Sequence, residues 1–136
     1  MSTIKVTNIQ DTSGGNSSTS EQIFQGRAKA WVCMEAFGTV AIEDDFNVSS
    51  ITDESTGHFV INFSTSLSNT NYAVIASATN YTNDDTIAGV GVDASTAYTN
   101  STGGVDLKST SQVRIGCAGG STAYDPKELY AVVFGD

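Results

Sequence analysis

The stretch that decides the fold reads Gly26-Arg-Ala-Lys-Ala-Trp-Val-Cys-Met-Glu35, continues as Ala36-Phe-Gly-Thr-Val-Ala-Ile42 and, after a turn at Gly57, ends in His58-Phe-Val-Ile-Asn-Phe63. Apolar residues recur at every second position in its first and last parts. In a β-strand successive side chains point to opposite faces, so every second residue lies on the same face. The stretch therefore predicts β-strands separated by turns, each with one face on a hydrophobic core.

The first of these strands has a second face that is also partly apolar, because it carries Trp31 and Cys33. A strand that is apolar on both faces suits either the inside of a sandwich or a contact between subunits. Trp31 is accordingly either a core residue, as we expect for Tyr72 and Tyr130, or part of an oligomer contact.

Short alternating or apolar runs continue along the chain, joined by segments rich in Gly, Asn, Asp and Ser. They predict strands over residues 4–9, 27–35, 39–42, 46–51, 58–63, 72–80, 87–92, 113–117 and 129–134. Residues 53–57 have the composition of a turn. The pattern predicts an all-β fold, a jelly-roll-like antiparallel β-sandwich of about eight short strands. Leu129–Phe134, apolar on both faces, should be a central buried strand.

The N-terminal residues differ in composition from the rest. Residues 1–20 predict a strand and a flexible Ser- and Gly-rich connector, together an arm, and residues 21–136 predict a single sandwich domain. Ser18 and Glu21 have capping-box spacing, so at most one short helix is expected near residues 19–25.

Charge limits the classes of partner. The 136 residues carry a net charge of −9 with only six Lys and Arg. Nucleic-acid binding needs cations that replace phosphate counterions, so we expect no nucleic-acid partner and no anionic membrane surface. No segment approaches the roughly 20 apolar residues that span a bilayer, and no signal peptide is evident. Folding in a cytoplasm is therefore expected, with Cys33 and Cys117 reduced and acting as small buried hydrophobes.

One pattern over roughly residues 1–80 resembles a known family. Its segments are Gln25-Gly-Arg-Ala-Lys-Ala-Trp-Val32, Gly38-Thr-Val-Ala-Ile42, Phe46-Asn-Val-Ser-Ser-Ile-Thr-Asp53 and Asn71-Tyr-Ala-Val74. They resemble tail-fibre-like virion structural proteins of tailed, particularly marine, bacteriophages. The chain departs from that pattern at Cys33, where a polar residue is usual, and at residues 34–37, where a Gly- or Asn-rich turn is usual.

The resemblance implies a virion component, assembled in the host cytoplasm, commonly homotrimeric and without catalytic activity. Its partners would be other virion proteins, of the tail or the capsid, and a glycan or protein of the host surface. In one placement the chain attaches to the host through loops at one end of the sandwich, at residues 81–86, 94–104 and 119–126. In the other, favoured by the absence of a shaft, it decorates the capsid and is anchored by residues 1–20.

Loop residues with aromatic rings or carboxylates are the candidates for receptor contact, because loops carry recognition and tyrosine rings stack on sugars. These candidates are Tyr81, Asp84, Asp85, Tyr98 and Tyr124. The candidates for an oligomer or virion contact are Ile4, Val6, Ile9 and Trp31. For the arm residues among them, the alternative is an ordinary edge strand followed by a loop.

Signs of catalysis are weak. His58 is the one histidine, it lies on the polar side of a strand, and no Gly-x-Ser-x-Gly motif flanks a serine. Acidic groups at residues 43–45, 53–54 and 84–85 raise two alternatives, glycosidic cleavage and Ca²⁺ binding, but EF-hand spacing is absent. We therefore expect no enzyme, no cofactor and no metal, and keep a polysaccharide depolymerase and a lectin-like domain as weaker alternatives.

Overall fold

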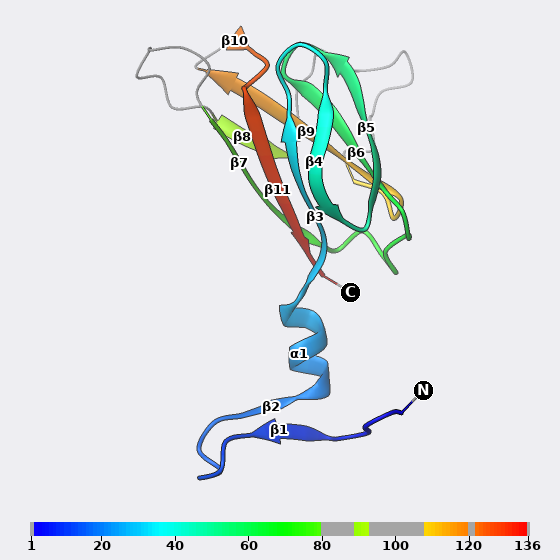
Figure 1. Cartoon of the computed structure of the whole chain (residues 1–136), viewed down its shortest axis with the longest axis vertical. Coiled ribbons are helices and arrows are strands. Elements are labelled where there is room, and N and C mark those ends of the chain that lie inside the picture. The colour runs from blue at the N-terminus through cyan, green and yellow to red at the C-terminus, as the bar shows by residue number, and fades with distance from the viewer. Residues whose placement is uncertain (1, 80–88, 93–107, 120–121, 136) are drawn as a thin grey trace.

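The computed structural model describes residues 2–79, 89–92, 108–119 and 122–135, which form a β-sandwich with an N-terminal arm (Figure 1). The described elements are β1 (Asn8–Gln10), β2 (Ser17–Thr19), α1 (Ser20–Gly26), β3 (Ala28–Glu35), β4 (Ala41–Phe46), β5 (Val48–Ser55), β6 (His58–Phe63), β7 (Ala73–Ala78), β8 (Gly89–Val92), β9 (Gln112–Gly119), β10 (Thr122–Ala123) and β11 (Glu128–Phe134). All of the strand pairs are antiparallel. The prediction of an all-β sandwich is confirmed.

The sandwich consists of two sheets. One has the strand order β4-β3-β11-β7, and the other has the order β10-β9-β6-β5 with β8 also paired to β9. β3 and β11, which are far apart in the sequence, pair with each other in one sheet. β6 and β9, which lie between them in the sequence, pair with each other in the other sheet, as in jelly rolls. The prediction for the last strand is confirmed, because β11 lies between β3 and β7.

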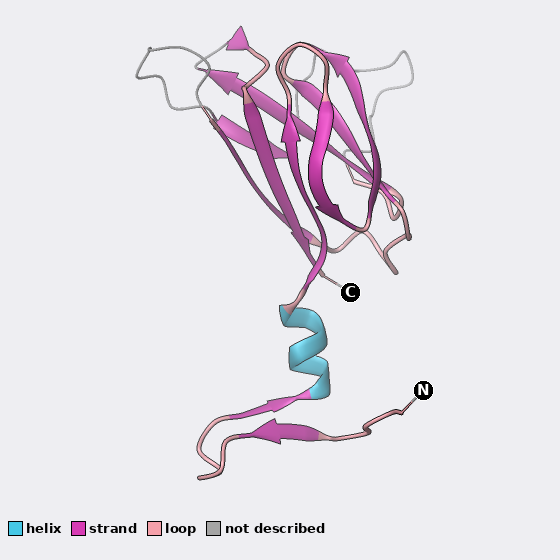
Figure 2. Ribbon diagram, viewed as in Figure 1, coloured by secondary structure: helices cyan, strands magenta, loops and turns pink. Residues whose placement is uncertain are grey.

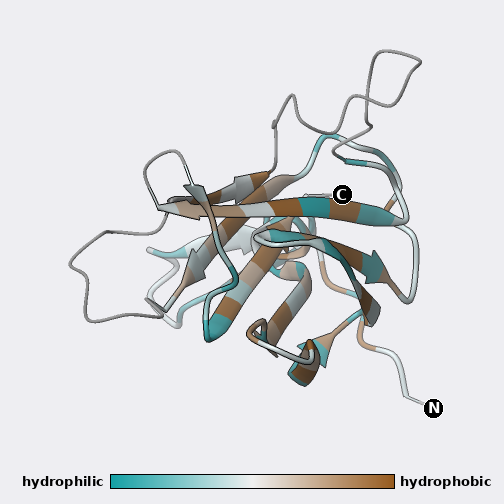
Figure 3. Ribbon diagram, turned by 90° about the horizontal axis from the view of Figure 1, so that it is seen from above, coloured by the Kyte–Doolittle hydropathy of each residue, from teal (hydrophilic) through white to brown (hydrophobic). Residues whose placement is uncertain are grey.

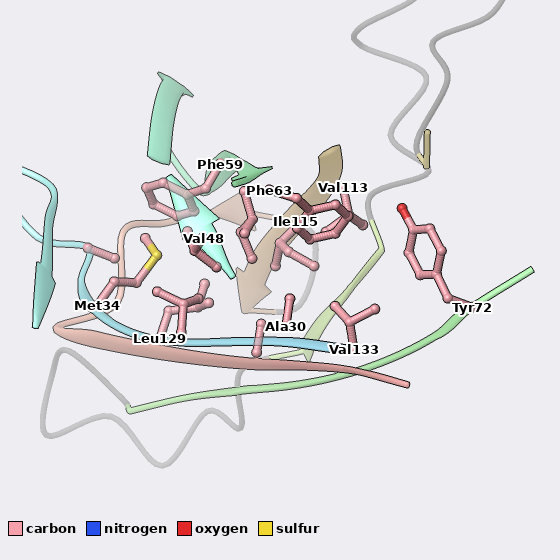
Figure 4. Packing of buried hydrophobic residues seen from close by; sticks show 14 of the residues in the cluster. Ala30, Met34, Val48, Phe59, Phe63, Tyr72, Val113, Ile115, Leu129 and Val133 are labelled. Carbon is pink, nitrogen blue, oxygen red and sulfur yellow. The ribbon is translucent and has the colours of Figure 1, made fainter. Parts of the chain in front are cut away.

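The core fills the space between the two sheets (Figure 4). Phe59, Ile61 and Phe63 of β6 are buried there, facing Ala30 and Met34 of β3. Burying a large apolar side chain contributes roughly 1.5–3 kcal/mol. The alternation predicted for β3 and β6 is thus the one that builds the core, and Figure 3 shows the accompanying change from hydrophobic to hydrophilic colour along the strands.

The connection between β4 and β5 differs from the prediction. Phe46 ends β4 and does not begin the next strand, since the chain turns at Asn47, whose φ is 58°. The Asn47 Nδ2 donates to the carbonyl oxygens of Lys29 (3.0 Å) and Thr65 (3.1 Å), and its Oδ1 accepts from the Thr65 amide at 2.7 Å. These bonds hold a backbone conformation that non-glycine residues seldom adopt.

The turn predicted over residues 53–57 is shorter in the structure. β5 continues to Ser55, and Gly57 (φ 74°) makes the turn into β6. The Gly57 amide donates to Asp125 Oδ1 at 2.6 Å, and the Gly57 carbonyl accepts from the Cys117 amide at 2.8 Å. This turn is packed against the β9–β10 region, so tertiary contacts decide its length.

Two details of the arm also differ from the prediction. The first strand, β1, is shorter than residues 4–9, and Ile4 and Val6 precede it. α1 confirms the short helix expected near residues 19–25, but its capping box uses Thr19 and Gln22, one residue later than Ser18 and Glu21. The Thr19 side chain accepts from the Gln22 amide at 3.1 Å, and the Gln22 Oε1 accepts from the Thr19 amide at 2.9 Å.

Candidate interaction surfaces

The N-terminal arm, residues 2–27, projects from one end of the sandwich (Figures 1 and 2). It consists of the β1–β2 hairpin and α1, and every described residue in it is exposed. Its apolar side chains are among the most exposed of the described part of the chain, with 87% exposure for Ile4 and 58% for Ile9. α1 lies outside the sandwich, which begins at Ala28.

The hairpin of the arm is held by a local turn around Asp11. The Asp11 Oδ1 accepts from the amides of Ser13 (3.1 Å) and Gly15 (2.9 Å), and its Oδ2 accepts from Asn16 Nδ2 at 3.0 Å. The Ser13 hydroxyl also donates to Asp11 Oδ1, at 2.8 Å, and this bond is the main cause that lowers the pKa of the Asp11 carboxyl; the bonds from Gly15 and Asn16 lower it further. Together with the capping box they give the arm a defined local structure.

Local bonds alone do not make such an arm stable. An isolated two-stranded hairpin is marginal in water, and a helix of seven residues is far below the length at which isolated helices persist. Helices of this size gain their stability mainly from the surface on which an apolar face packs. The arm therefore has the properties of a segment that is completed by contact with another surface.

Lys29 joins the arm to the base of the sandwich. Its Nζ donates to the Phe24 carbonyl oxygen at 2.8 Å and lies 3.0 Å from the centroid of the Phe24 ring. The Arg27 guanidinium lies 5.1 Å from the same centroid. A groove of about 460 Å³ opens at this junction, and its lining consists of Phe24, Arg27, Ala28, Lys29, Phe46, Asn47, Thr65, Ser66, Leu67 and Ser68.

The outer face of the β4–β3–β11–β7 sheet, turned away from the core, carries an apolar row. Its members are Phe46, Trp31, Val132 and Ile75, one from each strand. Trp31 pairs in register with Phe46 and Val132, and Val132 pairs with Ile75. Residues directly opposite each other in antiparallel strands share a face, so the four side chains form one strip. Phe46 is 53% exposed and Ile75 is 64% exposed.

The aromatic residues considered for the core are divided between the core and the outer face of this sheet. That expectation is confirmed for Tyr72, which is 3% exposed and whose hydroxyl donates to the Ser109 and Gln112 carbonyl oxygens, both at 3.0 Å. It is wrong for Trp31, which is only half-buried, and for Tyr130, which is 36% exposed. The alternation of β3 and β11 turns these two side chains to the outer face.

An acidic group lies next to the apolar row on the same outer face. It consists of Glu35, Glu43, Asp44 and Glu128. Asp44 pairs with Cys33, and Glu128 pairs with Glu35. The Tyr130 hydroxyl donates to Glu128 Oε2 at 2.5 Å, which is the main reason that the pKa of Tyr130 is raised to about 12.

Cys33 lies between the apolar row and the acidic group. Its Sγ donates to Glu43 Oε2 at 3.3 Å, and partial burial followed by this carboxylate raises the pKa of the thiol. The prediction of a buried cysteine is confirmed for Cys117 and wrong for Cys33, which is half-buried on the outer face. A thiol with a raised pKa is protonated at neutral pH and is a poor nucleophile.

Most of the candidate receptor residues, Tyr81, Asp84, Asp85 and Tyr98, lie outside the described residues. Tyr124, which is described, follows β10 and is half-buried. Its hydroxyl is buried near the Cys117 thiol, and burial is the main cause that raises the pKa of Tyr124 to about 12. Only part of the Tyr124 ring, and not its hydroxyl, is therefore open to a ligand.

Strand ends show where the three predicted contact loops join the sandwich. β7 ends at Ala78 and β9 ends at Gly119, both at the end opposite the arm, which we call the far end (Figure 1). β8 starts at that end, because Gly89 pairs with Ala118. β8 then runs toward the arm end. Lys108 also lies at the arm end, because its Nζ donates at 3.0 Å to the carbonyl oxygen of Tyr72, just before β7. The residues that flank 80–88 and 120–121 thus lie at the far end, whereas Lys108, which follows 93–107, lies at the arm end.

His58 has a geometry that does not suit general-base catalysis. Its Nδ1 lies 2.8 Å from the Thr56 carbonyl oxygen and 3.3 Å from the Ser55 hydroxyl. A carbonyl oxygen only accepts, so this contact assigns the proton to Nδ1. A protonated Nδ1 cannot take the proton of Ser55, so the two side chains do not form a nucleophile–base pair.

The acidic residues of β4 and β5 have structural partners. Asp44 Oδ1 accepts from the Asp45 amide at 2.9 Å, Asp45 Oδ2 accepts from the Val48 amide at 3.2 Å, and Glu54 forms a salt bridge with Arg114. Within the described ranges, no three His, Cys, Asp or Glu side chains are grouped as metal ligands would be.

Comparison with protein-family models, with curated proteins and with solved structures finds no match. Among the described residues, no helix combines the length and the apolar character needed to span a membrane.

Proposed function

We propose that this protein is a non-enzymatic virion surface protein of a tailed bacteriophage, tail-fibre-like and homotrimeric, which attaches to the host surface through loops at the far end of the sandwich. The observation that carries the proposal is the division of the chain into a compact sandwich and an exposed arm. The arm projects from the end of the sandwich that is opposite the far end (Figure 1). Such a division separates a surface for assembly from a surface for recognition.

The strand ends favour two of the three predicted loops for attachment. Residues next to 80–88 and 120–121 lie at the far end, so Tyr81, Asp84 and Asp85 belong to a segment that joins the sandwich there. The segment with Tyr98 is followed by Lys108 at the arm end. The proposal therefore assigns host contact to the first two segments and not to the third.

The chemistry of the described residues supports a binding role. His58 and Ser55 do not form a catalytic pair, and Asp44, Asp45 and Glu54 are engaged in structural bonds. A sandwich with recognition loops on a rigid scaffold needs no catalytic group to attach to a surface.

Binding of fluorescently labelled full-length protein to susceptible cells tests the proposal. We expect staining of these cells and not of resistant ones, and we expect the triple variant Tyr81→Ala, Asp84→Ala, Asp85→Ala to lose most of it. Tyr98→Ala is the matched control and should keep the staining. Absence of staining by protein verified as a trimer would overturn the attachment role, and loss with Tyr98→Ala alone would overturn the assignment to the far end.

A second candidate function is a capsid decoration protein anchored by its arm. The exposed apolar residues of the arm, led by Ile4 and Ile9, favour it, because they suit a contact with another virion protein. The number of copies per virion separates the two functions. Copies on the order of hundreds indicate the capsid and tens or fewer indicate the tail, and deletion of residues 1–20 should abolish docking to the capsid if the protein decorates it.

A further inference from the structure

We infer that the outer face of the β4–β3–β11–β7 sheet is the docking surface for the N-terminal arm of a second copy of this chain. The inference goes beyond the proposed function, because it concerns how copies are held together and not what the assembled protein binds. It stands on three properties of the two surfaces: their apolar residues, their charge and their length.

The apolar row is a surface that lacks a cover within its own described chain. Single exposed apolar residues are ordinary, but Phe46, Trp31, Val132 and Ile75 stand side by side in register across four strands. Figure 4 shows that the core side chains of β3 and β11 rise from the other side of this sheet, so the row faces outward. The groove at the arm junction is continuous with it, because Phe46 belongs to both.

The arm supplies apolar residues in need of a surface. Ile4, Val6 and Ile9 are 87%, 49% and 58% exposed, and the core cluster of the sandwich contains no described residue of the arm. The Lys29 contact with Phe24 fixes the end of α1 at the base of the sandwich, and from there the arm leads away from its own outer face (Figure 1). The arm therefore meets the outer face of another copy more readily than its own.

Charge selects the arm, and not a second sandwich, as the occupant. Residues 1–27 contain two cations (Lys5, Arg27) and two carboxylates (Asp11, Glu21), so their net charge is zero. The whole net charge of −9 thus belongs to residues 28–136. Two sandwiches in contact would bring negative charges close to each other, including those of the acidic group on the outer face. The arm has no net charge, and it would bring Lys5 toward the acidic group.

The two surfaces also match in length. Strands lie about 4.8 Å apart, so a row across four strands measures roughly 14 Å. An extended segment rises about 3.4 Å per residue, so Ile4 to Ile9 spans roughly 17 Å along the backbone, with Ile4 and Val6 on one face of the segment and Ile9 on the other. An extended arm segment laid across the strands can reach the whole apolar row.

Sedimentation equilibrium of the full chain across the micromolar range is the first test. We expect self-association that weakens at least about tenfold in Ile75→Lys and in Val6→Lys, since each places a charge in an apolar contact. Thr122→Lys adds the same charge on β10 and should associate as the wild type does. Circular dichroism checks that each variant is folded. A monomeric wild type, as expected if the arm binds only another virion protein, would overturn the inference, as would variants that associate normally.

A disulfide test identifies the two surfaces directly. Val6→Cys places a thiol on the arm, and Cys33 already lies beside the apolar row. Copper-phenanthroline, which accepts the two electrons as the thiols lose their two protons, is added at mildly alkaline pH because the pKa of Cys33 is raised. We expect a product of two or more chains on a non-reducing gel, absent from wild type and from Val6→Cys with Cys33→Ser. A product that keeps the mass of one chain, or no product, would overturn the inference.

Discussion

The sandwich and the arm are held by bonds of different range. In the sandwich, the Gly57 amide donates to Asp125 across 68 residues of chain, and Tyr72 donates to Ser109 across 37. In the arm, the Asp11 carboxylate bonds to residues two to five positions away, and the capping box spans three. The sandwich is thus specified by contacts between distant segments, and the arm by contacts between neighbours.

This difference indicates two units that lose structure separately. Long-range pairing is cooperative, because removing one strand exposes the core that all the others share. Local turns and caps open alone, at a free energy set by a few bonds. We therefore expect changes in the arm to leave the unfolding of the sandwich unaltered, and each prediction below probes that separation.

The largest effect is expected for Phe59→Ala, because the Phe59 side chain is fully buried between the sheets. Truncation of a buried phenylalanine costs about 3–5 kcal/mol of the free energy of unfolding. Ile9→Ala in the arm should change it by less than about 0.5 kcal/mol. Urea unfolding at low protein concentration, followed by the fluorescence of Trp31, measures both. A similar loss from the two variants would show that the arm packs on its own sandwich.

A second, sharper comparison uses two glycines with the same backbone angle. Gly57 and Gly14 both have φ of 74°, in the sandwich and in the arm respectively. A Cβ at Gly57 would lie 2.5 Å from the Cys117 carbonyl oxygen and 2.9 Å from the Tyr124 amide nitrogen, whereas at Gly14 it would meet nothing within 4 Å. Gly57→Ala should therefore destabilise the sandwich by about 3 kcal/mol, combining left-handed strain with a clash.

Gly14→Ala is the control for that comparison. It carries only the left-handed strain, about 1–2 kcal/mol, and this should weaken the β1–β2 hairpin without moving the unfolding curve of the sandwich. Amide hydrogen exchange of residues 8–19 reports the hairpin. Equal shifts of the unfolding curve in both variants would mean that the arm and the sandwich unfold as one unit.

The same contrast in range explains what the sequence predicts well. The strands β3, β6 and β11 are predicted from their own residues, because period-two alternation or a continuous apolar run is a local signal. The turn at Asn47 is not, since its positive φ is stabilised by the Lys29 and Thr65 carbonyl oxygens, which lie 18 residues away on either side.

The apolar row is a second feature that local sequence patterns do not predict. The pattern of β3 gives two faces, but only the packing of the sheets decides that Trp31 is on the outer one. Nothing local relates Trp31 to Phe46, Val132 and Ile75, because register between distant strands brings them together. Loop residues such as Tyr81 are candidates by residue type alone, because Tyr81 and Tyr98 lie outside the described residues.

A third prediction uses alkaline pH to destabilise the sandwich selectively. Burial raises the pKa of Tyr72 to about 12, above the ordinary value of 10.0 that holds in the unfolded chain. Its neutral form therefore stabilises the sandwich fully below pH 10.0, and this stabilisation is lost as the pH rises toward about 12. The arm, residues 2–27, has no tyrosine and lacks this dependence.

Tyr72→Phe is the variant that isolates this group. It removes the single hydroxyl proton that Tyr72 shares between the Ser109 and Gln112 carbonyl oxygens, so the free energy of unfolding at neutral pH should fall by about 1–2 kcal/mol. Its decline between pH 10 and 12 should be shallower than in the wild type, with Tyr124 and Tyr130 accounting for what remains. Parallel pH profiles of the variant and the wild type would contradict the assignment to Tyr72.

The smallest effect is expected at acid pH, in the arm alone. Hydrogen bonds, those from Ser13 first, lower the pKa of Asp11 below 3.8, so the ionised carboxylate supports the hairpin above that pH. As the pH falls through the lowered pKa, the carboxylate is protonated and this support is lost. The protection of the Ser13 and Gly15 amides, measured as exchange relative to the intrinsic rate at each pH, should then fall in the wild type, while Asp11→Asn should show no such acid dependence. The sandwich signal from Trp31 should not distinguish the two proteins. If it did, the Asp11 turn would be coupled to the core, and the arm would have to be regarded as part of the domain and not as a segment available to a neighbouring copy.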